Sequence, residues 1–322
     1  MDSLLISAIS GALILLASMA SVELGVSVAI VEILAGVVGG NWLGLHSLPW
    51  MDFLAGFAGI VLTFLAGAEV DPDVLRARWK ESLLVGGVSF LAPFVAAMAF
   101  AYWALGWSGR ASQIAGVALS TTSLAVVYAV LVETGLAATR IGKMIMASTF
   151  VTDFGTALAL SLLFIRPGVM LAVFVVVSAL LIVLVPRLSP WFFRRYGNRV
   201  IEPEIKLIFA ALLLLMWVAD LGQSHAVLPA FLLGLTMGRQ LSGQRTQQQR
   251  LRVVAFALLT PFFFLKSGMN ISLPAVATHW VWLVALFGVK LLTKFVGVYP
   301  LARRFVGRNA WYTTLLMIPI AY

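Results

Sequence analysis

The stretch STFVTDFGTALALSLLF, Ser148–Phe164, decides the fold of this chain. It is almost entirely apolar and long enough to enter a bilayer as a helix, yet Asp153 lies inside it. An ionisable residue within a spanning helix costs at least about 2.5–3.5 kcal/mol on insertion scales, so it usually faces a bundle interior or a water path. The stretch therefore predicts a membrane helix with a functional carboxylate. The alternative is a structural carboxylate paired with a neighbouring helix.

The rest of the chain has the same character. Of its 322 residues, 61% are hydrophobic and only 11% are charged, whereas soluble domains have about 25% charged residues. Apolar runs of about 15–25 residues follow one another, and they are too long and too uniformly apolar for the strands of a membrane barrel. The sequence predicts an all-α polytopic membrane protein, with one transmembrane domain over residues 1–322.

The apolar runs predict about 12 transmembrane helices, at roughly 3–20, 26–45, 53–70, 83–107, 112–135, 144–165, 167–187, 205–222, 226–240, 253–272, 277–299 and 311 onward. The longest polar segment, Pro186–Pro203, divides the chain into two halves. Transporters are often built from two inverted repeats. We therefore expect a first repeat with a linker helix over 1–186 and a second, incomplete repeat over 204–322, although residue identity does not demonstrate the repeat.

Basic residues predict the orientation of the chain. They gather after every second predicted span, as in Arg76–Lys80, Arg140–Lys143 and Arg303–Arg308, whereas the other loops hold little more than Arg110 and Arg166. Cytoplasmic loops carry the excess of Lys and Arg. The pattern therefore predicts an integral membrane protein with its N-terminus outside.

The overall charge and the residue types exclude several classes of function. The net charge of +9 lies in the short loops, so we expect it to set orientation and do not expect nucleic acid as a partner. Cysteine is absent, which excludes disulfides and thiol chemistry, and the three histidines are scattered. No phosphate-binding loop, zinc-protease sequence or serine-nucleophile sequence occurs. We expect neither an enzyme nor a bound cofactor.

Hydroxyl side chains surround Asp153 in the sequence. Thr149 and Thr156 are four residues before it and three after it, so the three share one helix face, and Thr152 adds a hydroxyl beside them. Carboxylate and hydroxyl oxygens suit a hard cation such as Na⁺. The sequence predicts a proton or cation site here. The alternative for each threonine is a hydrogen bond to a carbonyl of its own helix.

A second polar group interrupts GVALSTTSLAVVYAVLVETG, residues 116–135. Four hydroxyl residues stand at the middle of this apolar span: Ser120, Thr121, Thr122 and Ser123. Hydroxyl side chains compete with the helix for backbone hydrogen bonds, and broken helices at membrane depth line binding sites. The run predicts a helix break. The alternative is close packing of small residues between helices.

Three lysines form a cationic group. Lys266 follows TPFFFL, and Lys290 and Lys294 lie four residues apart on one helix face. Two ammonium groups there would repel each other, so we expect one to reach the interface or to lose its proton. A buried lysine could pair with Asp153 and compete with protons and cations for it. The alternative for all three is an ammonium group that extends to the membrane surface.

Six pieces of the chain, in order, resemble the monovalent cation:proton antiporters. This is the sodium/hydrogen exchanger domain family, with its bacterial branch that includes potassium efflux antiporters. The pieces are VSVAIVEILAGVVGGNWLG (26–44), LTFLAGAEVDPDVLR (62–76), ALSTTSLAVVYAVLVETGLAATRIGK (118–143), ASTFVTDFGTALAL (147–160), VLPAFLLGLTMG (227–238) and TPFFFLKSGMNISL (260–273). Each piece is a weak pattern, but their common order over nearly the whole chain is specific.

The resemblance implies a fold and a function. It implies inverted repeats, a dimerisation domain and a core domain whose two broken helices cross beside an essential ion-binding and proton-binding acid, here Asp153. Ser120–Ser123 would form the first break, and Lys294, in KFVGVYPLAR, would be the core basic residue. The implied activity is exchange of Na⁺ or K⁺ for protons by alternating access. The implied setting is a homodimer in the cytoplasmic membrane of a bacterium or archaeon.

Two departures from the family pattern and two alternative functions remain. Thr152 stands where the family often has an acidic residue, Asn or Gln, which favours one cation per proton. The last span, WYTTLLMIPIAY, stops where the second broken helix should continue, so we expect a truncated second repeat. The alternatives are a potassium efflux system of channel-like behaviour and a non-transporting relative that serves as a membrane scaffold or sensor.

Overall fold

The structure is a computed structural model that describes residues 2–69, 72–164, 168–197, 199–242, 245–307 and 310–318. The side chains of residues 72–78, 157, 160–162, 164, 239, 242, 245–247, 306 and 312 are not described. Two of the predicted basic residues, Arg166 and Arg308, therefore lie outside the described residues. Four others have side chains that are not described: Arg76, Arg78, Arg239 and Arg245.

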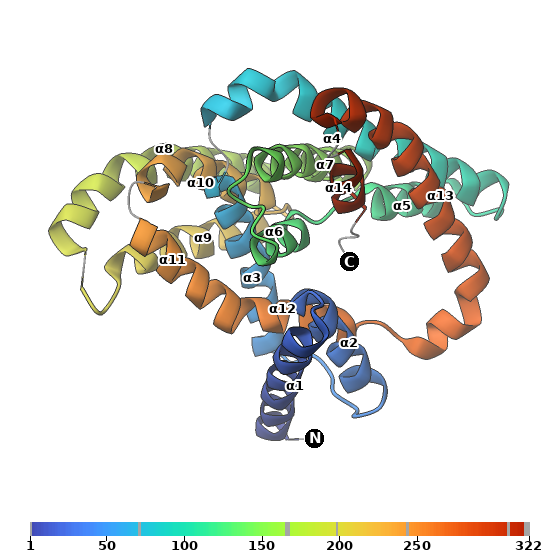
Figure 1. Cartoon of the computed structure of the whole chain (residues 1–322), viewed down its shortest axis with the longest axis horizontal. Helices are drawn as coiled ribbons and strands as arrows, with labels where there is room; N and C mark the ends of the chain where they lie inside the picture. Colours follow the sequence, from blue (N-terminus) through green and yellow to red (C-terminus); the bar gives the residue numbers. More distant parts are fainter. Residues whose placement is uncertain are drawn as a thin grey trace.

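The described chain is built from helices, and no strand occurs within it (Figure 1). In chain order the elements are α1 (Ser3–Leu24), α2 (Val28–Asn41), α3 (Pro49–Glu69), α4 (Pro72–Trp103), α5 (Gly109–Ser120), α6 (Leu124–Glu133), α7 (Arg140–Phe164), α8 (Val169–Tyr196), α9 (Pro203–Leu221), α10 (Val227–Ser242), α11 (Arg245–Val254), the π-helix η1 (Ala255–Leu259), α12 (Thr260–Met269), α13 (Leu273–Val306) and α14 (Ala310–Leu316).

These elements confirm the predicted fold class. Among the described residues, 7 helices are long and apolar enough to cross a membrane, and Val28–Asn41 and Val227–Gly238 are shorter apolar helices. Each predicted span corresponds to one helix or to consecutive helical segments. The predicted span 112–135 consists of α5 and α6 with a break between them, and 253–272 consists of the end of α11, η1 and α12.

The predicted span 167–187 ends too early, because α8 continues through Pro186 and Pro190 to Tyr196. Pro190 has no N–H to donate to the Pro186 carbonyl, which should break the helix. Gln240 of α10 donates to that carbonyl at 2.6 Å instead, and the Ser189 hydroxyl donates to it at 3.2 Å. A side chain from another helix thus satisfies the freed carbonyl, and the helix persists.

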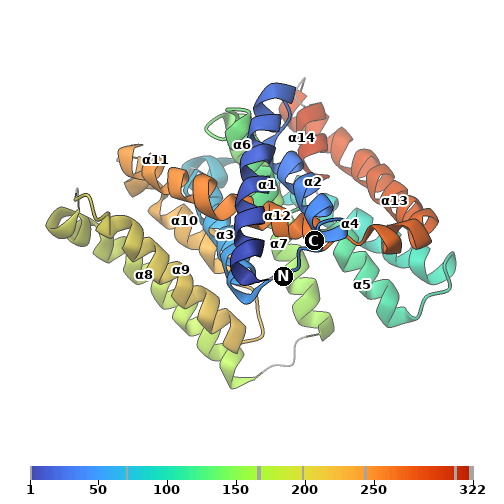
Figure 2. The ribbon, with the colours of Figure 1, turned by 90° about the horizontal axis from the view of Figure 1, so that it is seen from below.

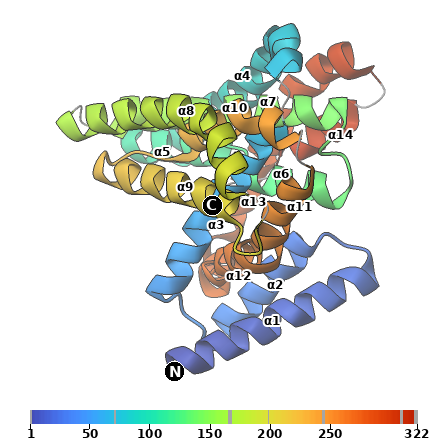
Figure 3. The same ribbon diagram turned by 90° about the vertical axis from the view of Figure 1, so that its left-hand side faces the viewer.

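The helices form two groups that pack mainly within themselves. The scaffold group consists of α1–α3 and α8–α12, in which α3 packs on α10, α2 on α12 and α8 on α9. The core group consists of α4–α7, α13 and α14, in which α4 packs on α5, α7 and α13. Figure 2 shows α8 with α9 at one edge and α4, α5 and α13 at the opposite edge, and Figure 3 shows α1 and α2 together at one end. The two groups meet chiefly where α3 contacts α6.

Glycines bring α3 and α10 into backbone contact. A Cβ atom added at Gly67 would lie 2.2 Å from the Phe231 carbonyl oxygen, and one at Gly234 would lie 2.0 Å from the Phe64 carbonyl oxygen. Neither position accommodates a side chain. Small residues that allow such close approach are typical of helix pairs in membranes, where burial of apolar surface does not drive association.

The crossing of α2 and α12 repeats this contact residue by residue. A Cβ at Gly36 would lie 2.1 Å from the Leu265 carbonyl oxygen, and one at Gly268 would lie 1.9 Å from the Ile33 carbonyl oxygen. The partner carbonyl is three residues before the facing glycine in both crossings. The helices α2 and α12 therefore contact each other through the same arrangement of glycines and carbonyls as α10 and α3 do.

Candidate functional site

The predicted helix break is present. Helix α5 ends at Ser120, Thr121 has extended backbone with φ −66° and ψ 152°, and α6 begins at Leu124. The Ser123 hydroxyl caps α6 by accepting a hydrogen bond from the Val126 N–H at 3.4 Å. Serine is a favoured N-cap residue. Ser123 therefore begins a new helix, α6, at the centre of an apolar span and separates it from α5.

The start of α6 faces Asp153. The Leu124 N–H lies near the Asp153 carboxylate, which is carried by α7 of the same group, and it favours the ionised form of that carboxylate. The N-terminal end of a helix has free N–H groups and the positive end of the helix dipole. The break therefore supplies donors that stabilise a negative charge on Asp153 in the interior of the bundle.

Both lysines of α13 are buried beside the break. The Lys294 ammonium group donates to the Thr122 hydroxyl and to the Met317 carbonyl, each at 2.5 Å. The Lys290 ammonium group donates to the Thr121 carbonyl at 3.3 Å. Neither lysine extends to the membrane surface, so that alternative is wrong for this pair. Lys294 is also close enough to Asp153 for their charges to attract each other.

The end of the described chain reaches the same place. The Thr122 hydroxyl donates to the Met317 carbonyl at 2.8 Å, and the Thr149 hydroxyl lies 3.3 Å from the Met317 sulfur. Met317 follows α14 directly, so the segment predicted to begin the second broken helix meets the first break. Residues 319–322, which complete the predicted last span, lie outside the described residues.

Three predicted hydroxyl ligands make hydrogen bonds within their own helices. The Thr152 hydroxyl donates to the Thr149 carbonyl at 2.6 Å, and the Thr156 hydroxyl donates to the Thr152 carbonyl at 2.9 Å. The Ser120 hydroxyl donates to the Val117 carbonyl at 2.9 Å. These hydrogen bonds are the alternative stated for the threonines, and they fix the hydroxyl oxygens against the helix backbone.

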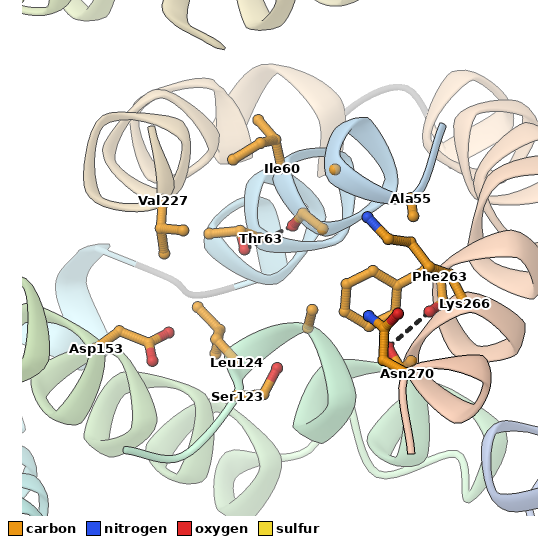
Figure 4. Close-up of a pocket in the computed structure, with 14 residues that line it drawn as sticks. Ala55, Ile60, Thr63, Ser123, Leu124, Asp153, Val227, Phe263, Lys266 and Asn270 are labelled. Carbon is orange, nitrogen blue, oxygen red and sulfur yellow. Dashed lines mark hydrogen bonds between the residues drawn. The ribbon is translucent and has the colours of Figure 1, made fainter. Parts of the chain in front are cut away.

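A cavity of about 450 Å³ separates the two helix groups (Figure 4). Its lining comes from α3, α10 and α12 of the scaffold group and from α6 and α7 of the core group. Of the predicted site residues, Asp153, Ser123 and Lys266 line it. Among its described lining residues, Asp153 and Lys266 are the ionisable ones, and Figure 4 shows them on opposite sides of the cavity.

Sequence reasoning missed polar residues of the scaffold wall. Thr63 of α3 and Ser267 and Asn270 near the end of α12 also line the cavity. Thr63 precedes Gly67 by one helical turn, and Ser267 and Asn270 flank Gly268, so each lies close to a glycine crossing. Polar residues near a helix-pairing glycine were the available sign of this wall.

The C-terminal end of α3, at Glu69, makes polar contacts with α11. Glu69 is buried, and its carboxylate pairs with the Arg252 guanidinium group of α11. The Gln248 side chain donates to the same carboxylate oxygen at 2.5 Å. The cavity lining on α3 comes from Ala55 to Thr63, so it stops short of Glu69. The cavity lining on α3 therefore lies toward the end of the helix that carries Asp52.

The site offers one carboxylate, a helix N-terminus and hydroxyl and carbonyl oxygens. Within the described residues, no group of three or more His, Cys, Asp or Glu side chains is arranged to hold a metal ion. A single carboxylate with neutral oxygen ligands can bind either a proton or a hard monovalent cation. Such a set releases its ligand more readily than a cage of several anionic groups does.

Comparison with known proteins identifies the family. The sequence model of the transmembrane sodium/hydrogen exchanger family matches residues 9–321. The chain is 29% identical over 260 residues to the probable Na(+)/H(+) antiporter 3 of Methanocaldococcus jannaschii, covering 77% of this chain and 65% of that protein. It is 28% identical over 256 residues to cation/H(+) antiporter 15 of Arabidopsis thaliana, covering 74% of this chain and 31% of that protein. The chain thus spans less than two thirds of the length of both relatives.

Two further comparisons concern the length and the fold. The chain is 24% identical over 305 residues to the Na(+)/H(+) antiporter NhaS4 of Synechocystis, covering 84% of this chain and 74% of that protein. The solved structure of the sodium proton antiporter MjNhaP1 from Methanocaldococcus jannaschii at pH 8 aligns with a TM-score of 0.66 and 14% sequence identity. That alignment covers 99% of this chain and 82% of the other, so the fold is shared over the whole chain.

Proposed function

We propose that this chain, which belongs to the transmembrane sodium/hydrogen exchanger family, is a secondary active transporter that exchanges a monovalent cation, Na⁺ or K⁺, for protons. The observation that carries this proposal is Asp153 on the wall of a cavity between two helix groups, with the Leu124 N–H aimed at its carboxylate. The relatives named above are antiporters of cations and protons, which supports the same reaction class here.

Competition for one carboxylate couples the two ions. Protonated Asp153 is neutral and has no charge to attract a cation, whereas ionised Asp153 attracts one strongly in a cavity with low-dielectric walls. Loss of the proton to the cavity therefore precedes uptake of the cation. The Leu124 N–H stabilises the ionised form in the interval between the two. The core group then carries the bound cation to the opposite side of the membrane. Asp153 releases the cation there, binds a proton and returns, which completes the exchange.

The hydroxyl groups around Asp153 remain proposed ligands. A hydroxyl that donates its hydrogen to a carbonyl keeps lone pairs that can face a cation. Thr149, Thr152 and Thr156 are fixed in this way or by a neighbouring sulfur, and Ser123 lines the cavity itself. Because Thr152 is not a second carboxylate, we propose one cation per proton.

Alternating access requires the core group to move against the scaffold group. The large contacts lie within each group, and the cavity lies between the groups. Lys294 ties the first break to Met317, so the site would move as one body. Each group contains helices from both proposed repeats, 1–186 and 204–322.

The distribution of basic residues supports an orientation. With the N-terminus outside, the Asp52 end of α3 faces outward, and Glu69 with Arg252 closes the cytoplasmic end. The cavity would then be open to the outside. We also propose that the protein is a homodimer in the cytoplasmic membrane of a bacterium or archaeon, as its family resemblance implies.

The test is cation-driven proton movement in everted vesicles from a bacterium that lacks its own antiporters. Na⁺, Li⁺ and K⁺ are added in turn, and internal pH is followed with a fluorescent dye. We expect a response from the native chain that falls to background in Asp153→Asn. The matched control is Asp220→Asn, an exposed carboxylate near the end of α9, which should retain the response. Transport at full rate in Asp153→Asn would rule the mechanism out.

A further inference from the structure

An ion pair stands on the scaffold wall, across the cavity from Asp153. The Lys266 ammonium group of α12 lies 2.7 Å from a carboxylate oxygen of Asp52 in α3. The Lys266 side chain is 26% exposed and the Asp52 side chain is 49% exposed, so the pair is in contact with solvent. Lys266 lines the cavity, and Asp52 lies one turn before Ala55, the first lining residue of α3.

The carboxylate of this pair is held in place. Asp52 is in the first turn of α3, where the helix dipole favours a negative charge. The Ser47 hydroxyl also donates a hydrogen bond to the carboxylate oxygen that contacts Lys266. The rigid partner is therefore Asp52, and the flexible partner is the lysine with its four-carbon stem.

Stability alone does not account for the pair. Ion pairs with this degree of exposure contribute little to stability. The two helices are already in contact beneath it, because a Cβ at Gly59 of α3 would lie 3.2 Å from the ring of Phe263 of α12. The distinctive property of the pair is its location. Lys266 brings a positive charge to the cavity that leads to Asp153, the proposed cation-binding carboxylate.

A lysine in this place has two possible effects on a cation. A free ammonium group would repel an arriving cation, and its stem would let it extend into the cavity toward Asp153. Lys266 held by Asp52 forms a neutral pair, and it lies across the cavity from Asp153 (Figure 4). A unit charge within several ångströms of a water-filled path changes the local cation concentration by about three- to tenfold.

We propose that Asp52 and Lys266 form a charge filter at the mouth of the cavity, in which Asp52 restrains and neutralises Lys266 and thereby sets the affinity of the cavity for its cation. This inference rests on the proposed function and assigns two specificity-determining residues to it. Neither residue binds the cation at Asp153. They act on its local concentration and on the space that it enters.

The kinetic test uses single and double neutral variants in the vesicle assay. Asp52→Asn should raise the KM for the cation about three- to tenfold, because it frees the ammonium group, with Vmax within twofold of the native value. Lys266→Gln should lower KM, and the double variant should return KM toward the native value. Lys266→Arg keeps the charge and should behave as the native chain. The differences in KM between the variants should shrink when choline chloride raises the ionic strength.

A second measurement reports the charge at the mouth without any transport. The chain has no cysteine, so Ser267→Cys on the cavity wall gives a single reactive thiol. Its rates with a trimethylammonium-bearing and a sulfonate-bearing methanethiosulfonate are compared. The ratio of cationic to anionic rates should fall about three- to tenfold in Asp52→Asn and rise in Lys266→Gln. Ser108→Cys, exposed at the start of α5 and not among the cavity residues, is the control whose ratio should not change.

The two measurements separate the failure of this inference from the failure of the proposed function. A native chain without Asp153-dependent exchange would defeat the proposed function, while the reagent ratios would still test the filter. Unchanged ratios in both neutral variants would overturn the filter even if exchange is normal. A rise of KM in Asp52→Asn and Lys266→Gln alike, with lower thermal stability in both, would show a structural pair and would also overturn it.

Discussion

At the scale of single residues, the site depends on which partners the charged groups find inside the helix bundle. The Leu124 N–H lies near Asp153, and the Lys294 ammonium group donates hydrogen bonds to a hydroxyl and a carbonyl. Lys290 has a single longer contact, to the Thr121 carbonyl. The two ammonium groups are one helical turn apart, so they repel each other. The two lysines therefore contribute differently to the same site.

Replacing each lysine by methionine tests this difference. Lys294→Met removes a charged donor from two buried acceptors, and each lost hydrogen bond to a charged group costs about 1.5–3 kcal/mol. Lys290→Met removes one weak contact and relieves a repulsion. We expect thermal unfolding of the purified protein in detergent to occur several degrees lower for Lys294→Met and near the native temperature for Lys290→Met. Equal losses in the two variants would contradict this assignment.

At the scale of helices, two glycine crossings and one break set the position of the site. The crossings bring α3 against α10 and α2 against α12, and together they build the scaffold wall of the cavity. The break between α5 and α6 aims a helix end at Asp153. The wall and the break come from opposite helix groups. The geometry of the cavity therefore depends on backbone contacts that tolerate no added side chain.

Gly234→Ala tests the crossing directly. Its Cβ would lie 2.0 Å from the Phe64 carbonyl oxygen, so α3 and α10 must move apart. Overpacking of this kind costs about 1–3 kcal/mol, and we expect a lower unfolding temperature and a lower rate of exchange. The control is Gly288→Ala in α13, where an added Cβ meets no atom within 4 Å and helix propensity improves. Equal stability of the two variants would contradict the crossing.

At the scale of the whole molecule, local hydropathy explains how much of the fold the sequence predicts. Each long apolar run became a helix or a pair of helical segments, and the break fell at Ser120–Ser123 as predicted. These features depend on residues that are neighbours in the chain. The helical stretch beyond Pro186 was not predicted, because Gln240 of a distant helix satisfies its free carbonyl.

The site itself was only partly predictable from the sequence. Asp153 could be found because one carboxylate within an apolar run is conspicuous. The polar scaffold wall at Thr63 and Asn270 was missed, because the polar residues beside glycines indicate a wall only once it is known which helices cross there. Whether both Lys290 and Lys294 are buried was left open by the sequence, since their acceptors at Thr121 and Met317 are supplied by the break and by the chain end.

The central claim joins these scales: one carboxylate between two helix groups binds either a proton or a cation. The most direct measurement is proton release when the cation identified in vesicles is added to purified protein in weakly buffered detergent. The native chain should release up to about one proton per chain, with less release as the starting pH rises and Asp153 is already ionised. Asp153→Asn should release none. Cation binding without proton release, or equal release from both proteins, would contradict the account.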